Sequence, residues 1–328
     1  MSGTKARRGI AATLAATATV VCPGCILGNR PTFVHTGTRP EQITFYLDGA
    51  GNFGFGKESV PLGLADGGYE GHVRHYIWTS YLGPVADQIY LSHNRREGMQ
   101  LAEEIEKHLD LYPTGHVNVI ALSAGTGVAV FALETLRPTY SVDNVILLSS
   151  SLSSDYDLTR ALRRVRGSIY FFWSPDDPIL EDLVPMLRTV DGSRTATPAG
   201  IWGARLPRGA PPETVRLYQK QVVNRRWSPS IASGPFKLRH AGSINRGVIR
   251  QLVAPIVVAK PPDRSGSPIE TATSTRPTFR RASPAPPVSP TPYPTPGRPA
   301  LRPTPTVRPG AAGRGPLAPS TRPSAALR

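Results

Sequence analysis

The chain has 328 residues and a formal net charge of +15, from 38 lysines and arginines against 23 aspartates and glutamates. Its two cysteines, Cys22 and Cys25, both lie near the start, which excludes a disulfide framework, a zinc–cysteine cluster and a cysteine nucleophile further along. Composition divides the chain into an apolar leader over residues 1–25, a globular region over 30–258 and a basic tail over 259–328. A globular region of about 230 residues is long enough for one sizeable core and too short for two comfortable domains.

The leader is typical of an export signal. Its first eight residues include three basic side chains, and the apolar or small run 10–21 that follows is too short to cross a bilayer. Gly24 directly before Cys25 resembles the processing site of bacterial lipoproteins, although the preceding pair Cys22-Pro23 fits that site poorly. We therefore expect export to the cell envelope, either with lipid attachment at Cys25, which would anchor the protein to a membrane, or by secretion after cleavage nearby.

The tail supplies most of the positive charge. Residues 260–328 hold eleven lysines and arginines against two acidic residues, and residues 261–328 hold eighteen of the 35 prolines. Proline removes backbone donors and large apolar side chains are scarce, so we expect a disordered segment without catalytic residues. Because the charge lies in this segment, nucleic-acid binding is not favoured, whereas contact with an anionic envelope polymer stays open.

The globular region alternates predicted strands with predicted helices. Strands are expected over residues 42–47, 72–81, 117–122, 145–148 and 169–173 and within 215–227, and helices over 125–136, 158–165 and 243–253. A further helix is expected after an N-cap at Asn94, with an inner face of Leu101, Ala102, Ile105 and Leu109. The later strands lack polar alternation, which is typical of parallel strands buried on both faces. The sequence therefore predicts an α/β protein with a mostly parallel central sheet and helices on both faces, whose ligands bind beyond the carboxyl ends of the strands.

A serine stands at the turn between one of these strands and the helix after it. The segment Ala121-Leu122-Ser123-Ala124-Gly125 is a variant of the pattern Gly-x-Ser-x-Gly. Small residues are needed two places before and after the serine because the strand and helix backbones crowd there, and the turn lifts the serine oxygen clear of the sheet. This makes Ser123 the candidate nucleophile.

A nucleophilic serine needs a base within hydrogen-bond reach and a carboxylate that orients this base. His240 is the only histidine after Ser123, and the order serine, acid, histidine accompanies a serine in such a turn. The predicted strand 169–173 is followed by Asp176 and Asp177. Either aspartate could turn toward the histidine, and we favour Asp177 because Asp-Pro-Ile after a short turn is typical of the acid loop.

Acyl transfer also requires donors aimed at the developing oxyanion. The backbone N–H of Ala124, directly after the serine, is expected to be one of them. The second is expected in the turn Asp48-Gly49-Ala50-Gly51, where glycines allow a close approach to the substrate, with the N–H of Ala50 as the donor.

These segments resemble the α/β-hydrolase superfamily, in particular its esterases and lipases, over residues 40–257. The resemblance implies an eight-stranded or slightly reduced sheet, a Ser-His-Asp mechanism without a cofactor, and a small-molecule or lipid-like ester as substrate. Asp48 departs from the family, since esterases often carry histidine there. The leading hypothesis is an exported serine hydrolase of carboxylic esters. The alternatives are a thioesterase or amidase on the same residues and a catalytically silent scaffold that binds an envelope component.

Overall fold

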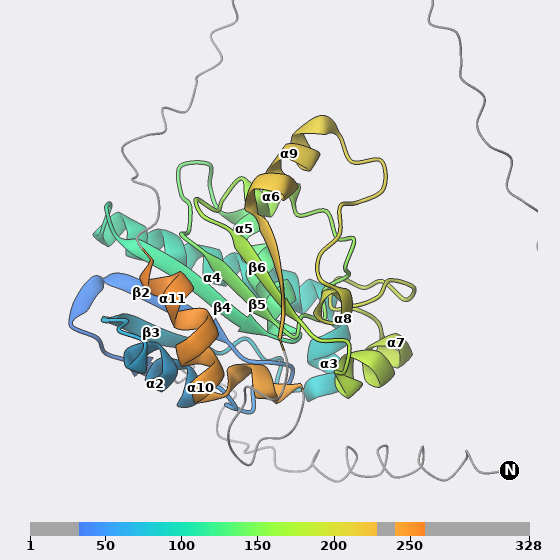
Figure 1. Cartoon of the computed structure of the whole chain (residues 1–328), viewed down its shortest axis with the longest axis horizontal. Helices are drawn as coiled ribbons and strands as arrows, with labels where there is room; N and C mark the ends of the chain where they lie inside the picture. The colour runs from blue at the N-terminus through green and yellow to red at the C-terminus, as the bar shows by residue number, and fades with distance from the viewer. Residues whose placement is uncertain (1–32, 228–239, 260–328) are drawn as a thin grey trace, which may run out of the picture. The chain divides into compact units, whose positions relative to one another are not determined.

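The computed structural model describes residues 33–227 and 240–259 (Figure 1). The predicted leader, with Cys25, and the predicted tail from Lys260 onward lie outside the described residues. Within the part of the chain that the structure describes, no helix combines the length and the apolar character needed to cross a membrane.

A seven-stranded sheet forms the centre of the described structure, in the order β1-β3-β2-β4-β5-β6-β7. The strands are β1 (Phe33–His35), β2 (Arg39–Leu47), β3 (Gly71–Tyr76), β4 (His116–Leu122), β5 (Val145–Leu148), β6 (Ile169–Trp173) and β7 (Val222–Arg226). Strand β1 pairs antiparallel with β3, and each of the other neighbouring pairs is parallel. The predicted mostly parallel sheet is confirmed.

Helices cover both faces of the sheet. Successive residues of a buried strand point to opposite sides, so each strand contributes apolar side chains to both faces. Val119 and Ala121 of β4 pack in one apolar cluster with the helices α4 and α5, whereas Ile120 and Leu122 pack in a second cluster with α2 and the C-terminal helices. The helical segments of six or more residues are α2 (Ser59–Asp66), α3 (Pro84–Ile89), α4 (Leu91–Leu111), α5 (Gly125–Thr135) and α9 (Pro212–Gln221). The shorter ones are α6 (Thr159–Leu162), η2 (Ile179–Leu183), α7 (Val184–Leu187), α8 (Ala199–Trp202), η4 (Ala241–Ile244), α10 (Arg246–Val248), η5 (Ile249–Val253) and α11 (Ala254–Val258).

Helix α4 begins earlier than predicted. It starts at Leu91, so Asn94 lies inside the first turn, and the prediction of Asn94 as the N-cap is wrong. The Asn94 side chain is buried, and its Nδ2 donates to the carbonyl oxygen of Asp87 at 2.7 Å, which ties α4 to α3 instead of closing the helix end. The predicted inner face of this helix is confirmed, because Leu101, Ala102, Ile105 and Leu109 are all buried.

Three other predicted elements have different bounds. The strand expected over 72–81 ends at Tyr76, because the following backbone turns aside: the N–H of Trp78 donates to Asn52 and that of Ser80 to Asp87. The strand expected within 215–227 is confirmed as β7, and residues of helix α9 precede it in that segment. The helix expected over 158–165 is shortened to α6. The helix expected over 243–253 starts at Arg246 and continues through α11 to Val258.

Candidate active site

The carboxyl ends of three neighbouring parallel strands meet at one edge of the sheet. Ser123 follows the last residue of β4, and Ser149 follows the last residue of β5. Asp177 lies in the loop that follows β6, which ends at Trp173. Because β4, β5 and β6 are adjacent and parallel, these loops share the edge where ligands of such sheets bind.

Ser123 stands in a strained backbone turn. Its φ is 52°, in the left-handed region that residues with a side chain rarely adopt and that costs of order 1–3 kcal/mol. Its N–H donates to the carbonyl oxygen of Leu148 at 3.0 Å, and its own carbonyl oxygen accepts from the Thr126 hydroxyl at 2.5 Å. The turn is therefore held by the end of β5 on one side and by the first turn of α5 on the other.

The small residues around the serine have a steric reason. A Cβ atom at position 125 would collide with the carbonyl oxygen of Asp48, because the start of α5 packs directly on the end of β2. A Cβ atom at position 49 would lie 3.3 Å from the Cβ of Ser123, so the glycine turn after β2 passes beside the serine. The predicted nucleophile and the predicted oxyanion turn thus lie next to each other.

His240 and Asp177 are in hydrogen-bond contact. The Nδ1 of His240 lies 2.8 Å from Oδ2 and 3.0 Å from Oδ1 of Asp177, whose side chain is 1% exposed. The same carboxylate also accepts the backbone N–H groups of Ile179 and Leu180, each at 3.2 Å. Of the two aspartates that the sequence left open, Asp177 contacts the histidine, and Asp176 is exposed.

The backbone of His240 is fixed between the strands that carry the other two residues. Its carbonyl oxygen accepts from the hydroxyls of Ser149 at 3.2 Å and Ser243 at 3.3 Å, and Ser149 directly follows β5, the strand between β4 and β6. Among the described residues, no hydrogen bond joins His240 to the hydroxyl of Ser123. In enzymes without bound substrate, such a bond is often long and tightens only when the substrate is present.

The sheet has six parallel strands and one antiparallel strand at its edge, and the strained Ser123 lies between β4 and α5. An aspartate beyond β6 and a histidine in contact with it follow in the chain order that accompanies such a serine. The chain has the α/β-hydrolase fold. The expected eight-stranded or slightly reduced sheet is realised with seven strands in the described residues.

No protein-family model matches the chain, and no curated protein sequence matches it. Among solved structures, it is similar to a cutinase-like protein from Cryptococcus (11% identity, TM-score 0.34, 68% of this chain and 98% of that chain). It is also similar to the esterase domain of a Rhodothermus marinus protein (11%, 0.37, 69% and 98%) and to the esterase Pf2001 of Pyrococcus furiosus (12%, 0.34, 68% and 98%). The strand order and the strained serine, rather than these distant likenesses, define the fold.

Asp48, the residue that departs from the α/β-hydrolase pattern, points into the protein. Its buried carboxylate accepts the Tyr46 hydroxyl at 3.0 Å, the N–H of Gly49 at 2.9 Å and the N–H of Phe55 at 2.8 Å. It therefore closes the turn from inside and occupies the N–H of Gly49. The next N–H, that of Ala50, has no partner among the described residues.

A second buried carboxylate, which the sequence analysis missed, holds the other half of the same turn. Oδ2 of Asp87 accepts the N–H of Gly51 at 2.9 Å and the Thr79 hydroxyl at 2.7 Å, while Oδ1 accepts the N–H and hydroxyl of Ser80 at 2.7 and 2.5 Å. Burying a carboxylate is costly unless it is hydrogen-bonded, and Asp87 meets that condition with four donors. Because this turn passes beside Ser123, Asp87 helps to fix the backbone next to the serine without contacting the serine itself.

The N–H of Ala124 lies at the start of helix α5, directly after the serine, and it too has no partner within the described segments. Backbone N–H groups at a helix start are well suited to bind negative charge. The two N–H groups that the sequence analysis selected, those of Ala50 and Ala124, thus both lack a hydrogen-bond partner among the described residues.

His75 supports the turn after β2 through Asn52 and is not one of the residues predicted for the site. Its Nε2 accepts from the Asn52 side-chain amide at 3.1 Å, since the oxygen of that amide is used by Trp78. Burial lowers the pKa of His75, and the charge of Asp48 opposes this shift only in part. Burial, followed by the charge of Asp48, raises the pKa of Tyr46 well above its usual value. Both side chains therefore stay uncharged near neutral pH and support the turn.

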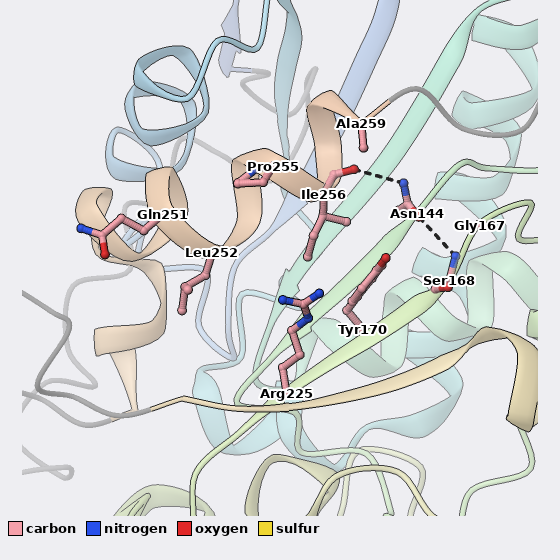
Figure 2. Close-up of a pocket in the computed structure, with 10 residues that line it drawn as sticks. All are labelled: Asn144, Gly167, Ser168, Tyr170, Arg225, Gln251, Leu252, Pro255, Ile256 and Ala259. Atoms are coloured by element: carbon pink, nitrogen blue, oxygen red, sulfur yellow. Dashed lines mark hydrogen bonds between the residues drawn. The ribbon is translucent and has the colours of Figure 1, made fainter.

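A pocket of about 400 Å³ lies elsewhere, near the amino ends of β5 and β6 (Figure 2). Asn144 spans part of it, with its Nδ2 bonded to the carbonyl oxygen of Ile256 and its Oδ1 to the N–H of Ser168. Arg225 lies over the ring of Tyr170. None of the residues predicted for the site lines this pocket. Within residues 33–227 and 240–259, no cluster of three or more histidine, cysteine, aspartate or glutamate side chains could hold a metal ion.

Proposed function

We propose that the protein is an exported serine hydrolase that cleaves carboxylic esters through an acyl intermediate on Ser123. The observation that carries the proposal is the contact of His240 Nδ1 with the buried carboxylate of Asp177, at the same sheet edge as the strained Ser123. With its Nδ1 proton directed to Asp177, the imidazole keeps a lone pair on Nε2 for the serine proton.

In the proposed reaction, Ser123 Oγ attacks the ester carbonyl carbon while its proton passes to His240 Nε2. Asp177 stabilises the imidazolium, and the tetrahedral oxyanion accepts hydrogen bonds from the N–H groups of Ala50 and Ala124. Collapse of this intermediate breaks the bond to the alkoxy oxygen, which leaves as the alcohol with the proton from His240. Water, deprotonated by the same imidazole, then attacks the acyl group and releases the carboxylic acid and Ser123.

A working nucleophile is proposed rather than a silent scaffold because of the backbone strain at the serine. A left-handed φ at a residue with a side chain persists only where the surrounding structure enforces it, and such strain gathers at active sites. A binding scaffold has no need for this strain, nor for a histidine that is oriented by a buried carboxylate. The export part of the proposal rests on the leader sequence, with its basic start, short apolar run and Gly24-Cys25 pair.

Covalent labelling tests the proposal directly. We expect a fluorophosphonate probe to label the purified protein, and we expect the label to be lost in Ser123→Ala. The same protein should hydrolyse p-nitrophenyl esters, and a series of graded acyl lengths would define the preferred acyl group. Absence of both labelling and ester turnover in the folded wild-type protein would refute the assignment.

A further inference from the structure

Large apolar side chains are exposed on three loops that follow the carboxyl ends of β2, β3 and β6. Leu82 and Met186 are 73% and 79% exposed. The set, called the apolar arc here, comprises Phe53, Phe55, Tyr81, Leu82, Val85, Ile179 and Met186. Single exposed apolar residues are ordinary on protein surfaces, whereas a contiguous group of them marks a binding surface.

Hydrogen bonds join the three loops of the apolar arc to one another. Asp87, at the end of the β3 loop, binds the N–H of Gly51 in the β2 loop. The side chain of Gln88 donates to the carbonyl oxygen of Arg188 at 2.9 Å, which ties α3 to the end of α7, and Figure 1 shows these two helices side by side. The segments that carry the arc are therefore linked to one another, from the β2 loop through α3 to the end of α7.

Both ends of the apolar arc reach the proposed active site. Phe53 and Phe55 stand in the loop that begins with the turn beside Ser123, with their rings 5.6 Å apart. Ile179, at the other end, gives its N–H to the carboxylate of Asp177. A partner that covers the arc would consequently also cover the loops that carry Gly49 and Asp177.

The backbone conformation and its hydrogen bonds hold the middle of the arc, Tyr81 and Leu82, in an exposed position. Tyr81 has a left-handed φ of 60°, its N–H donates to the Thr79 hydroxyl, and the N–H of Leu82 donates to the Ser80 hydroxyl. Asp87 holds both of these hydroxyls. The segment 81–86 carries no charged side chain, although the chain has 38 lysines and arginines. A fixed, uncharged loop that presents apolar side chains to water favours an apolar partner.

We propose that the apolar arc docks the enzyme on a water-insoluble ester phase, from whose surface the ester bond enters the site at Ser123. The inference rests on the proposed function and names its substrate class. An ester phase is favoured over a protein partner or a second copy because either of these, seated on the arc, would cover the two loops that adjoin the proposed site, those of Gly49 and Asp177. The substrate, by contrast, has to be there for the reaction to occur.

The test compares one acyl group in two physical states. The full-length wild type, Leu82→Asp and Met186→Glu are assayed on dissolved p-nitrophenyl butyrate and on emulsified tributyrin. Leu111→Asp serves as the control, because Leu111 is 70% exposed at the end of α4, outside the arc. We expect the ratio of emulsion to dissolved turnover to fall about tenfold in each arc variant, since each loses the burial of one apolar side chain, and to stay unchanged in the control.

A second readout needs no turnover. In the Ser123→Ala background, the protein should sediment with the emulsion, and addition of Leu82→Asp, but not Leu111→Asp, should abolish this. Unchanged ratios and unchanged sedimentation in the arc variants would overturn the inference, as would light scattering that shows a wild-type dimer and a monomeric Leu82→Asp with the ratio intact. Failure of the proposed function is distinct from these results, because it would appear as loss of fluorophosphonate labelling and of dissolved-ester turnover in the wild type.

Discussion

The buried carboxylate of Asp87 accepts a hydrogen bond from the backbone N–H of Gly51, 36 residues earlier in the chain, at 2.9 Å. Asp48 holds the other half of the same turn through the N–H groups of Gly49 and Phe55. Between these two contacts the N–H of Ala50 is left without a partner in the described part of the chain. Two carboxylates that contact no substrate in the proposed mechanism thus determine where a proposed oxyanion donor points.

Asp87→Asn should therefore slow ester hydrolysis without unfolding the protein. The amide retains one acceptor and introduces a donor against the Thr79 and Ser80 hydroxyls, so the turn shifts, and a displacement of about 1 Å at a catalytic group costs roughly a hundredfold in rate. We expect kcat to fall about tenfold to a hundredfold while KM changes little. Asp155→Asn, at an exposed aspartate, is the matched control. A normal kcat in Asp87→Asn would remove Asp87 from the support of the site.

The two neighbouring aspartates should differ sharply in their effect on turnover. Asp177→Asn replaces the carboxylate that contacts His240 Nδ1, which favours the wrong imidazole tautomer and should lower kcat about 10⁴-fold. Asp176→Asn changes an exposed side chain and should leave kcat close to that of the wild type. Steady-state kinetics on p-nitrophenyl butyrate distinguishes the two, and equal effects would contradict the assigned acid.

His240→Ala should lower ester turnover by about 10⁴-fold and leave the fold intact. The imidazole is lost, but the backbone carbonyl of residue 240, which binds Ser149 and Ser243, remains. Circular dichroism and the denaturation midpoint should match those of the wild type. Ordinary turnover in this variant would show that another group serves as the base.

Local signals were sufficient for the centre of the fold and for selecting candidate site residues, of which Asp177 and His240 are in contact. The strand, small-residue turn and helix around Ser123 are contiguous, and the order of serine, aspartate and histidine along the chain can be read without knowing the fold. Asp87 could not be found in this way, because its role depends on a contact with Gly51, which lies 36 residues earlier in the chain. Asn94 has the residue type of an N-cap, but its side chain makes a tertiary contact with the carbonyl oxygen of Asp87 instead.

The second strand was predicted too long for a related reason. Trp78 continues the aromatic character of β3, but it lies in the loop after the strand. Its side chain is buried there, and its Nε1 donates to the carbonyl oxygen of Asp48 at 2.8 Å. Residue type alone does not distinguish an aromatic side chain in a strand from one that anchors a loop. The apolar arc escaped notice likewise, since its members become neighbours only when the loops after β2, β3 and β6 are brought together.

The two expectations for the leader give different results in one partition experiment. If Cys25 carries acyl chains, the wild type and Cys22→Ser should enter the detergent phase of a Triton X-114 extract, and Cys25→Ser should stay in the aqueous phase. Secretion after cleavage predicts that all three stay in the aqueous phase. Mass spectrometry of the mature N-terminus provides an independent check of the processed residue.

Stability should decrease in mild acid because of His75. Burial lowers its folded pKa below the unfolded value of about 6.5, so between these two values the unfolded chain binds a proton that the folded protein does not. The free energy of unfolding then falls as the pH drops below about 6.5, and the contribution of this residue is fully present above that value. His75→Gln keeps an acceptor for the Asn52 amide and cannot titrate, so its unfolding free energy should depend less on pH between about 7.5 and 5. Urea denaturation of both proteins at several pH values measures this difference, and parallel curves would show that His75 does not contribute to it.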